Sequence, residues 1–231
     1  MKNILKNILK KSWFAPDAIE RNSIIDALKN TRNYARGRML DIGCGDKPYK
    51  PIFSDVLEEY IGIDREDSKL HTISPDVYGD FLSLPFENES FDTVLSTQVL
   101  DDIHDPDKAM VESFRVLKKG GHFILTSPFF WPIHDEPFDY CRYTKYGLKN
   151  LAEKSGFKVV FLKERGYFWA VLGEITSQYL FYDVSKYPKY KILSAFFIPF
   201  IALIQIICSV IDKLHKVDKY TLGYVMVCLK E

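Results

Sequence analysis

The chain has 231 residues, enough to bury one sizeable hydrophobic core. Its 31 lysines and arginines balance its 31 aspartates and glutamates, so no overall positive field favours DNA or RNA, and we expect no nucleic-acid partner. The four cysteines are scattered without Cys-x-x-Cys spacing, which argues against a zinc site and against a disulfide framework. We therefore expect a cytoplasmic globular protein with reduced thiols and no metal.

Residues 1–37 are predicted to form two helices. The first, over residues 1–11, is basic and carries its apolar residues on one face, at Ile4, Leu5, Ile8 and Leu9. It lacks the unbroken apolar core of a signal peptide, and two interpretations stay open. It is either a helix lying on an anionic membrane surface or a helix capping the domain that follows. The second helix is predicted over residues 16–36 and ends at Gly37.

Residues 38–45, R-M-L-D-I-G-C-G, have the pattern of a buried strand that runs into a ligand-binding loop. Asp41 is the one acid in the apolar run. Gly43 and Gly45 follow it, and glycines let a ligand approach the backbone closely. The alternative for the glycine pair is a tight turn between a strand and a helix.

A second apolar run, residues 60–64, ends in Asp64, where the next parallel strand of a nucleotide-binding sheet would present a carboxylate to ribose hydroxyls. A dinucleotide-binding loop would need a third glycine at the position of Pro48. The two strand ends therefore favour a nucleoside without a pyrophosphate.

The rest of the chain alternates predicted strands and helices, which is typical of a parallel α/β sheet. Residues 52–57 are predicted to be irregular. Further strands are predicted over residues 72–78, 91–97, 122–127, 158–162 and 220–228. Helices are predicted over residues 107–117, ending at the Lys-Lys-Gly-Gly run 118–121, and over residues 144–154, capped by Thr144.

Five motifs between residues 38 and 164 resemble, as a set, those of the class I S-adenosylmethionine-dependent methyltransferases. They are L-D-I-G-C-G, Y-I-G-I-D, G-D-F-L-S-L-P-F, S-F-D-T-V-L-S-T-Q-V-L and R-V-L-K-K-G-G-H-F-I-L-T-S-P. The resemblance implies an α/β fold whose seven-stranded sheet is mostly parallel, has helices on both faces and ends in an antiparallel strand. It implies S-adenosylmethionine as the cofactor, bound by the core of residues 38–164.

The resemblance also implies which residues bind the cofactor. In the family, an acid at the position of Asp80 faces the adenine amino group, the backbone N–H of the next residue, here Phe81, faces a ring nitrogen, and the end of the fourth strand touches the methionine half. The alternative for Asp80 is a solvated turn residue. His104 departs from the usual family pattern and is expected to be a plain loop histidine. The expected cofactor-binding residues are Asp41, Gly43, Gly45, Asp64, Asp80, Phe81, Thr97 and Gln98.

Residues 128–144, P-F-F-W-P-I-H-D-E-P-F-D-Y-C-R-Y-T, are predicted to form a lid over the acceptor, because they leave the fifth strand at the ligand edge and mix aromatic with charged residues. Related enzymes of glycan and lipid biosynthesis carry a similar pattern. We expect His134 to be the general base, with hydrogen bonding within the lid as the alternative. Arg142 either holds an anionic group of the acceptor or pairs with Asp139. The expected acceptor-binding residues are Trp131, Asp139, Tyr140, Arg142 and Tyr143.

Residues 165–218 are predicted to be an apolar helical insertion before the last strand, which lies within residues 219–231. Residues 192–211 are long enough to span a bilayer, but a single span would put the sixth and seventh strands on opposite sides. Pro199 favours a re-entrant hairpin, an in-plane helix or an oligomer interface. Peripheral contact with the inner membrane face and a buried helical subdomain or homo-oligomer both stay open.

These patterns predict a methyltransferase that acts on an oxygen of a small or lipid-linked acceptor, such as a sugar or isoprenoid. The first alternative is methylation of a carbon in a quinone-like ring. The second is a protein that binds the cofactor or a partner without turnover and is anchored by its helical insertion.

Overall fold

The computed structural model describes residues 13–66, 74–184 and 191–231, and for residues 191–197 only the backbone. The predicted helix over residues 1–11 lies outside this part of the chain. The chain forms two compact units. We call Ala27–Lys163 with Gly223–Glu231 the sheet unit, and the residues up to Asp26 with Glu164–Leu222 the helical unit.

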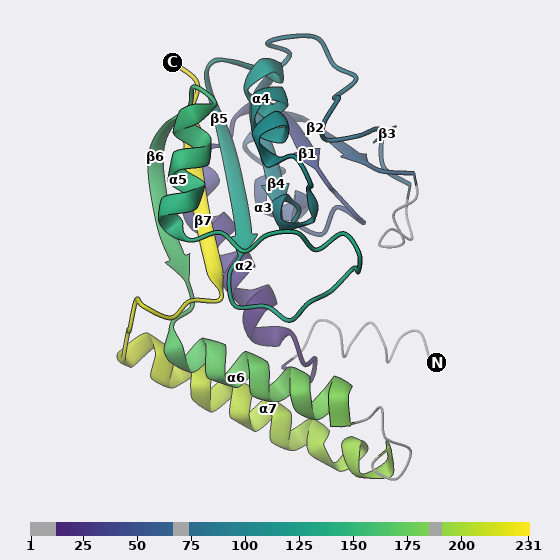
Figure 1. The fold of residues 1–231 in the computed structure, drawn as a ribbon, viewed down its shortest axis with the longest axis vertical. Helices are drawn as coiled ribbons and strands as arrows, with labels where there is room; N and C mark the ends of the chain where they lie inside the picture. The colour runs from purple at the N-terminus through teal and green to yellow at the C-terminus, as the bar shows by residue number, and fades with distance from the viewer. Residues whose placement is uncertain (1–12, 67–73, 185–190) are drawn as a thin grey trace. The chain divides into compact units, whose positions relative to one another are not determined.

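One seven-stranded sheet in the order β3-β2-β1-β4-β5-β7-β6 organises the fold (Figure 1). β1, β2, β3, β4 and β5 run parallel, whereas β7 runs antiparallel to β5. The predicted fold class is therefore confirmed. The strands are β1 (Gly37–Ile42), β2 (Leu57–Asp64), β3 (Val77–Tyr78), β4 (Phe91–Thr97), β5 (Leu117–Pro128), β6 (Lys158–Arg165) and β7 (Gly223–Leu229).

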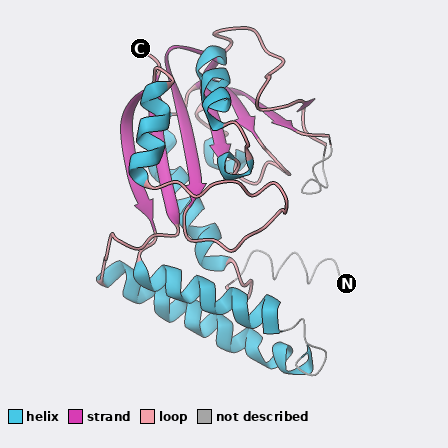
Figure 2. Cartoon of the chain, in the orientation of Figure 1, coloured by secondary structure: helices cyan, strands magenta, loops and turns pink. Residues whose placement is uncertain are grey.

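Helices cover both faces of the sheet, and α4 (Pro106–Val116) and α5 (Lys145–Lys154) lie side by side on one of them (Figures 1 and 2). Asp105 caps the N-terminus of α4 by accepting from the backbone N–H of Lys108. Thr144 caps α5 in the same way, as predicted. The apolar faces of both helices pack on buried residues of β1, β4, β5 and β7, and this core holds the strand ends in fixed positions.

Three predictions about local structure were wrong. The Lys-Lys-Gly-Gly run does not end a helix, because β5 already begins at Leu117 and pairs with β4. A Cβ atom on Gly121 would lie 2.8 Å from the carbonyl oxygen of Lys118, so the glycines allow a tight start to this strand. Residues 52–57 are not irregular throughout, because the short helix α3 (Lys50–Phe53) includes the first two of them and β2 begins at Leu57. The second predicted helix, α2 (Ala18–Thr31), is followed by the 3-10 turn η1 (Arg32–Tyr34) and so ends before residue 36.

The helical unit contains α6 (Phe168–Gln178), the π-helical turn η3 (Tyr179–Asp183) and α7 (Lys191–Leu214), and α6 and α7 lie side by side (Figure 1). They approach closely, since a Cβ atom on Gly173 would lie 2.7 Å from Cβ of Cys208. The carboxylate of Asp212 on α7 accepts the backbone N–H groups of Tyr167, at 3.0 Å, and Ala170, at 2.9 Å, and so caps α6.

α7 continues as a helix through Pro199, so the re-entrant hairpin is wrong. Among the described residues, none of the helices combines the length and the apolar character needed to cross a membrane. Inside the helical unit, buried Gln205 of α7 donates to the carbonyl oxygen of Ala15 at 2.8 Å. A buried ion pair joins Arg165 to Glu20 at 2.9 Å.

Candidate active site

A cavity of about 780 Å³ opens at the carboxyl ends of β1, β2 and β4, which is where open α/β sheets bind ligands. All eight residues expected to bind the cofactor line it. Other lining residues were not predicted from the sequence, and they come from the segment after Gly45, the end of β2, the segment after β4 and the lid. They include Asp46, Tyr49, Arg65, Asp102, Asp135, Glu136 and Phe138.

The loop after β1 has the backbone shape that its glycines permit. Gly43 has φ +71°, and a Cβ atom there would lie 2.3 Å from Cγ2 of Val99. Gly45 has φ +47° with open space at its Cβ position. Its backbone N–H donates to Oδ2 of Asp64 at 2.9 Å, so the end of β2 fixes the loop after β1. The glycine pair therefore forms a tight turn that also lines a cavity.

Asp41 lines the inner end of the cavity but is almost wholly buried. Its side chain is buried and accepts a hydrogen bond from the Tyr60 hydroxyl. Burial raises the pKa of Asp41 to about 7, although the Tyr60 hydrogen bond works in the opposite direction. Burial and the nearby carboxylates of Asp41 and Asp64 raise the pKa of the Cys44 thiol to about 12, so this thiol is a small apolar group at neutral pH.

Asp80, Phe81, Thr97 and Gln98 line the remaining wall of the cavity. Oδ1 of Asp80 accepts the backbone N–H of Leu82 at 2.9 Å, so Asp80 also stabilises a turn. The side-chain amide of Gln98 donates to Oγ1 of Thr126 at 3.0 Å. Gln98, directly after β4, has a left-handed backbone conformation with φ +56°.

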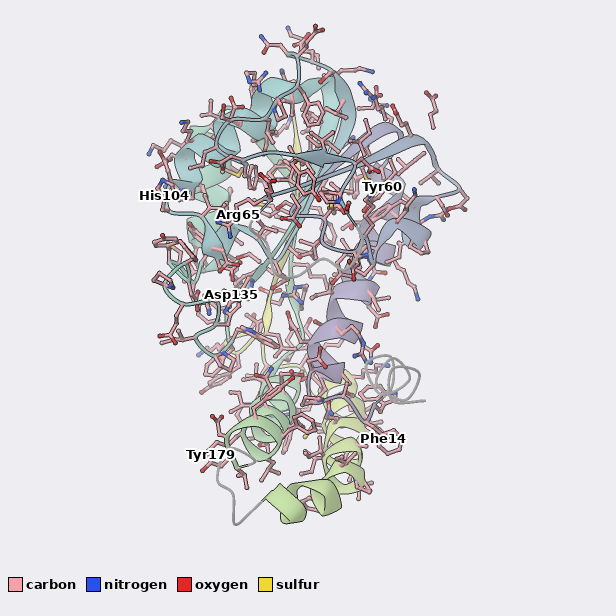
Figure 3. The ribbon with its side chains drawn as sticks, turned by 90° about the vertical axis from the view of Figure 1, so that its right-hand side faces the viewer. Phe14, Tyr60, Arg65, His104, Asp135 and Tyr179 are labelled. Atoms are coloured by element: carbon pink, nitrogen blue, oxygen red, sulfur yellow. The ribbon has the colours of Figure 1, made fainter. Side chains whose placement is uncertain are left out.

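The cavity is acidic. Among the described residues that line it, seven are aspartate or glutamate and one, Arg65, is basic. The guanidinium of Arg65 lies 5.5 Å from the ring centre of Phe138 in the lid, and both residues face the cavity. Figure 3 labels Arg65 at the end of β2 together with Asp135 of the lid. Such a wall favours a cationic ligand over a phosphate.

In the lid, Arg142 pairs with Asp139 through both of its terminal nitrogens. This hydrogen bonding lowers the pKa of the Asp139 carboxyl. The alternative in which Arg142 pairs with Asp139 is thus the arrangement observed. Oδ2 of Asp139 also accepts the backbone N–H of His134 at 3.1 Å and lies 3.2 Å from its Nδ1 atom. Nη2 of Arg142 lies 3.4 Å from the same Nδ1 atom, so this side of the His134 ring is held between a carboxylate and a guanidinium.

Nε2 of His134 faces two acids that follow β4, in the 3-10 turn η2 (Leu100–Asp102). It lies 3.6 Å from Oδ2 of Asp101 and 3.9 Å from Oδ1 of Asp102. Asp101 is fully buried, and neither of its carboxylate oxygens has a hydrogen-bond partner among the described residues. Burial and the neighbouring Asp102 raise the pKa of Asp101 to about 7. The sequence shows two adjacent acids a few residues after β4, but nothing in it pairs them with His134.

Two groups of three side chains have the donor chemistry of a divalent-cation site: Asp101, His134 and Asp139, and Asp102, His134 and Asp135. Arg142 contacts both acids of the first group, at 3.8 Å from Oδ2 of Asp101 and in the Asp139 pair. Its guanidinium already supplies positive charge there and would repel a metal ion. We therefore treat the first group, together with Arg142, as a cluster of charged side chains around His134.

A second hollow of about 200 Å³ lies on the lid. It contains four of the five residues expected to bind the acceptor: Trp131, Asp139, Tyr140 and Arg142. The fifth, Tyr143, lines neither hollow and packs against the hydrophobic core. The ring of Tyr140 lies 6.2 Å from that of His104, which is exposed in its loop.

Residues 40–125 match a family model described as a methyltransferase domain. A probable S-adenosylmethionine-dependent methyltransferase of Mycolicibacterium smegmatis is 30% identical over 133 residues, which are 52% of this chain and 52% of that protein. A ubiquinone/menaquinone biosynthesis C-methyltransferase of Bartonella bacilliformis is 29% identical over 118 residues, 49% of this chain and 44% of that protein. The chain thus spans about half the length, or less, of these curated relatives.

Among solved structures, a putative sarcosine dimethylglycine methyltransferase from Galdieria sulphuraria superposes with a TM-score of 0.59 at 16% identity. The match covers 93% of this chain and 86% of that one. At this identity the likeness concerns the fold. The chain therefore has the class I methyltransferase fold, and its residues 40–125 carry the methyltransferase-domain sequence pattern.

Proposed function

We propose that the protein is an S-adenosylmethionine-dependent methyltransferase that transfers a methyl group to an oxygen atom of a small or lipid-linked acceptor. The observation that carries the proposal is the position of His134. Its ring is held at Nδ1 by Asp139, while Nε2 faces Asp102, a residue of the cavity wall. A base therefore lies beside a cavity whose acidic wall suits a cationic nucleoside.

The residues of the cavity fit the cofactor in three respects. Asp64 at the end of β2 has a carboxylate that can accept ribose hydroxyls, and the backbone at Gly45 has open space beside it. The acidic wall matches a ligand with sulfonium and ammonium groups. When bound, S-adenosylmethionine supplies an electrophilic methyl carbon on a sulfonium that leaves as a thioether.

His134 acts as the general base for the one proton that the reaction releases. Nε2 would accept the proton of the acceptor hydroxyl while the oxygen of that hydroxyl is methylated. Asp139 stabilises the imidazolium that results. Phe138, on the cavity side of the lid, excludes water from the reacting atoms.

A carbon acceptor is the second candidate, because the Bartonella relative is named a C-methyltransferase. For either acceptor we propose that the reaction takes place in the cytoplasm, because the four cysteines are free thiols and reduced thiols are typical of that compartment. The hollow that contains Trp131 and Tyr140 offers aromatic walls to a ring-shaped acceptor, whether it is methylated at oxygen or at carbon.

The test has two parts. Calorimetry with purified protein should show binding of S-adenosylmethionine, and His134→Ala should bind it equally well. With cofactor labelled in its methyl group and extracts of sugars and lipids as acceptors, the wild type should transfer label and His134→Ala should lose at least about 100-fold in kcat, the range of general-base catalysis.

Each negative result has a distinct meaning. Cofactor binding without transfer to any extract contradicts catalysis and favours a binding protein. Transfer that survives in His134→Ala contradicts the base. The carbon shift of a ¹³C-methyl product separates an ether from a carbon-bound methyl group.

A further inference from the structure

The faces of α6, η3 and α7 that do not pack inside the helical unit, which we call their outer faces, are apolar. Each exposed residue that the structure describes on α6 or its junction with η3 is a large apolar or aromatic one, at Leu172, Ile175 and Tyr179. On α7 every exposed residue from Pro199 to Val210 is also apolar, and the first exposed charged residue after them is Lys213. Tyr179, labelled in Figure 3, lies at the outer edge of the helical unit. The large side chains on α7, between 42% and 83% exposed, are Phe200, Leu203, Ile206, Ile207, Val210 and Leu214.

The spacing of these residues is that of a helix seam. On α7, positions 200, 203, 207, 210 and 214 alternate steps of three and four, and on α6 positions 172, 175 and 179 do the same. A seam of this kind packs against another helix by inserting side chains between those of its partner. α7 uses a different seam for its contacts inside the helical unit, with Ile201, Gln205, Cys208 and Asp212 buried. The outer seam is therefore available for a second partner.

We propose that the partner is a second copy of this chain, which adds its own α6 and α7 to complete a four-helix bundle around a two-fold axis. The exposed area fits a dimer. At about 200 Å² for each large side chain, the exposed fractions correspond to roughly 900 Å², against about 800 Å² per partner in an interface of standard size. A two-fold axis pairs the same surface on both copies, and a face without charges avoids repulsion between like charges.

The charge pattern also favours a protein partner over a lipid surface. Helices that lie on anionic membranes carry lysine and arginine beside their apolar face. Among the described side chains of residues 168–184 and 198–214 the one lysine or arginine is Lys213, near the C-terminal end of α7. The carboxylates of Glu174 and Asp212 are buried inside the unit, and Asp183 is half-buried. The proposed dimer is independent of which methyl acceptor the protein uses.

Sedimentation of the full chain over low to high micromolar concentration tests the proposal. The wild type should sediment at twice the chain mass of 26.9 kDa. Val210→Lys should raise the dimer dissociation constant at least about 100-fold, because each copy would bury an unpaired ammonium group in the interface. Val111→Lys on α4 is the matched control, since Val111 and Val210 are 53% and 55% exposed, and it should stay dimeric.

Circular dichroism should show both variants folded, and if Val210→Lys does not fold, Val210→Ala replaces it and should weaken the dimer measurably. The proposal is overturned if the wild type sediments as a monomer throughout, or if its dimer survives Val210→Lys. Flotation of a monomeric wild type with vesicles of phosphatidylglycerol and phosphatidylcholine, lost in Val210→Lys, would overturn it in favour of a lipid surface.

Discussion

The carboxylate of Asp64, at the end of β2, accepts a hydrogen bond from the backbone N–H of Gly45 across 2.9 Å. Its other oxygen accepts the backbone N–H of Arg65 at 2.8 Å, so one carboxylate holds the loop after β1 and the residue after β2, both at the cavity wall. We expect Asp64→Ala to weaken binding of S-adenosylmethionine by tenfold or more, about the 1.4 kcal/mol of one hydrogen bond to a charged group. Calorimetry measures this, and Asp55→Ala, an exposed acid beyond the cavity lining, should bind as the wild type does.

The two loop glycines should differ in what they tolerate. In Gly43→Ala the new methyl group overlaps Val99, and we expect a loss of about 2–3 kcal/mol in the free energy of unfolding. In Gly45→Ala the methyl group meets open space, so the cost is about 1–2 kcal/mol for the left-handed backbone alone. Urea denaturation of both variants gives the comparison. Equal losses would show that Val99 moves aside freely.

Asp41 should make stability depend on pH. Its pKa is about 7 in the folded chain and about 4 in the unfolded chain, so the folded state binds the proton more tightly. The free energy of unfolding therefore falls as pH rises from about 4 to about 7. The asparagine side chain of the Asp41→Asn variant does not titrate, so the variant does not lose this stability. Its free energy of unfolding relative to that of the wild type should rise by a few kcal/mol between about pH 4 and about pH 7.

Denaturation of Asp41→Asn and wild type at pH 4.5 and pH 8 checks this difference. Asp55→Asn is the control, because a hydrogen bond from Arg32 lowers the pKa of Asp55, so its carboxylate is ionised in both the folded and the unfolded chain above about pH 4. Its stability relative to wild type should therefore be nearly the same at pH 4.5 and pH 8. A difference between Asp41→Asn and wild type that is independent of pH would contradict the prediction.

Asp139 is expected to act as a positioning residue. Asp139→Asn keeps the shape of the side chain but weakens the hold on the His134 ring and on Arg142. We expect kcat to fall about 10- to 100-fold while the dissociation constant of the cofactor stays unchanged. Steady-state kinetics and calorimetry separate the two. A parallel loss of cofactor binding would indicate that Asp139 only holds the lid in shape.

Asp212 should stabilise the helical unit through its contacts with the start of α6. Asp212→Ala leaves the backbone N–H groups of Tyr167 and Ala170 without their acceptor, and we expect a loss of about 1–3 kcal/mol in the free energy of unfolding. Thermal and urea denaturation measure it. Asp218→Ala, an exposed acid nearby in the sequence, should change stability by no more than about 0.5 kcal/mol.

The sheet was predictable because its signals are local. An apolar run that ends in glycines or in an acid, as at Gly43 and Asp64, marks a strand and its carboxyl end within a few residues. Parallel strands bring such ends to one edge, so eight residues far apart in the sequence line one cavity.

The errors lie where distant residues decide the structure. Gly120 and Gly121 suit a helix end by local rules, yet β5 begins before them because Gly120 and Lys230 are joined by a backbone hydrogen bond of 2.7 Å. The contact of His134 with Asp101 likewise joins two loops from different strands. Spacing along the chain carries no information about either pairing.

The apolar insertion shows the same limit. Its length and hydropathy fit a membrane segment, but Gln205 and Asp212 lie seven residues apart on one face of α7 and bond to backbone groups of neighbouring segments. Two polar residues on one face of an apolar helix are the signal that could have favoured packing against protein.

The place of β7 between β5 and β6 has a consequence for how the chain is made. β6 has no other neighbour in the sheet, so it cannot pair until the ribosome has synthesised α6, α7 and then β7. Until that moment the edge of β5 is open to pairing with other chains. The nascent chain therefore passes through a stage at which rapid completion of the α6–α7 segment protects it from aggregation.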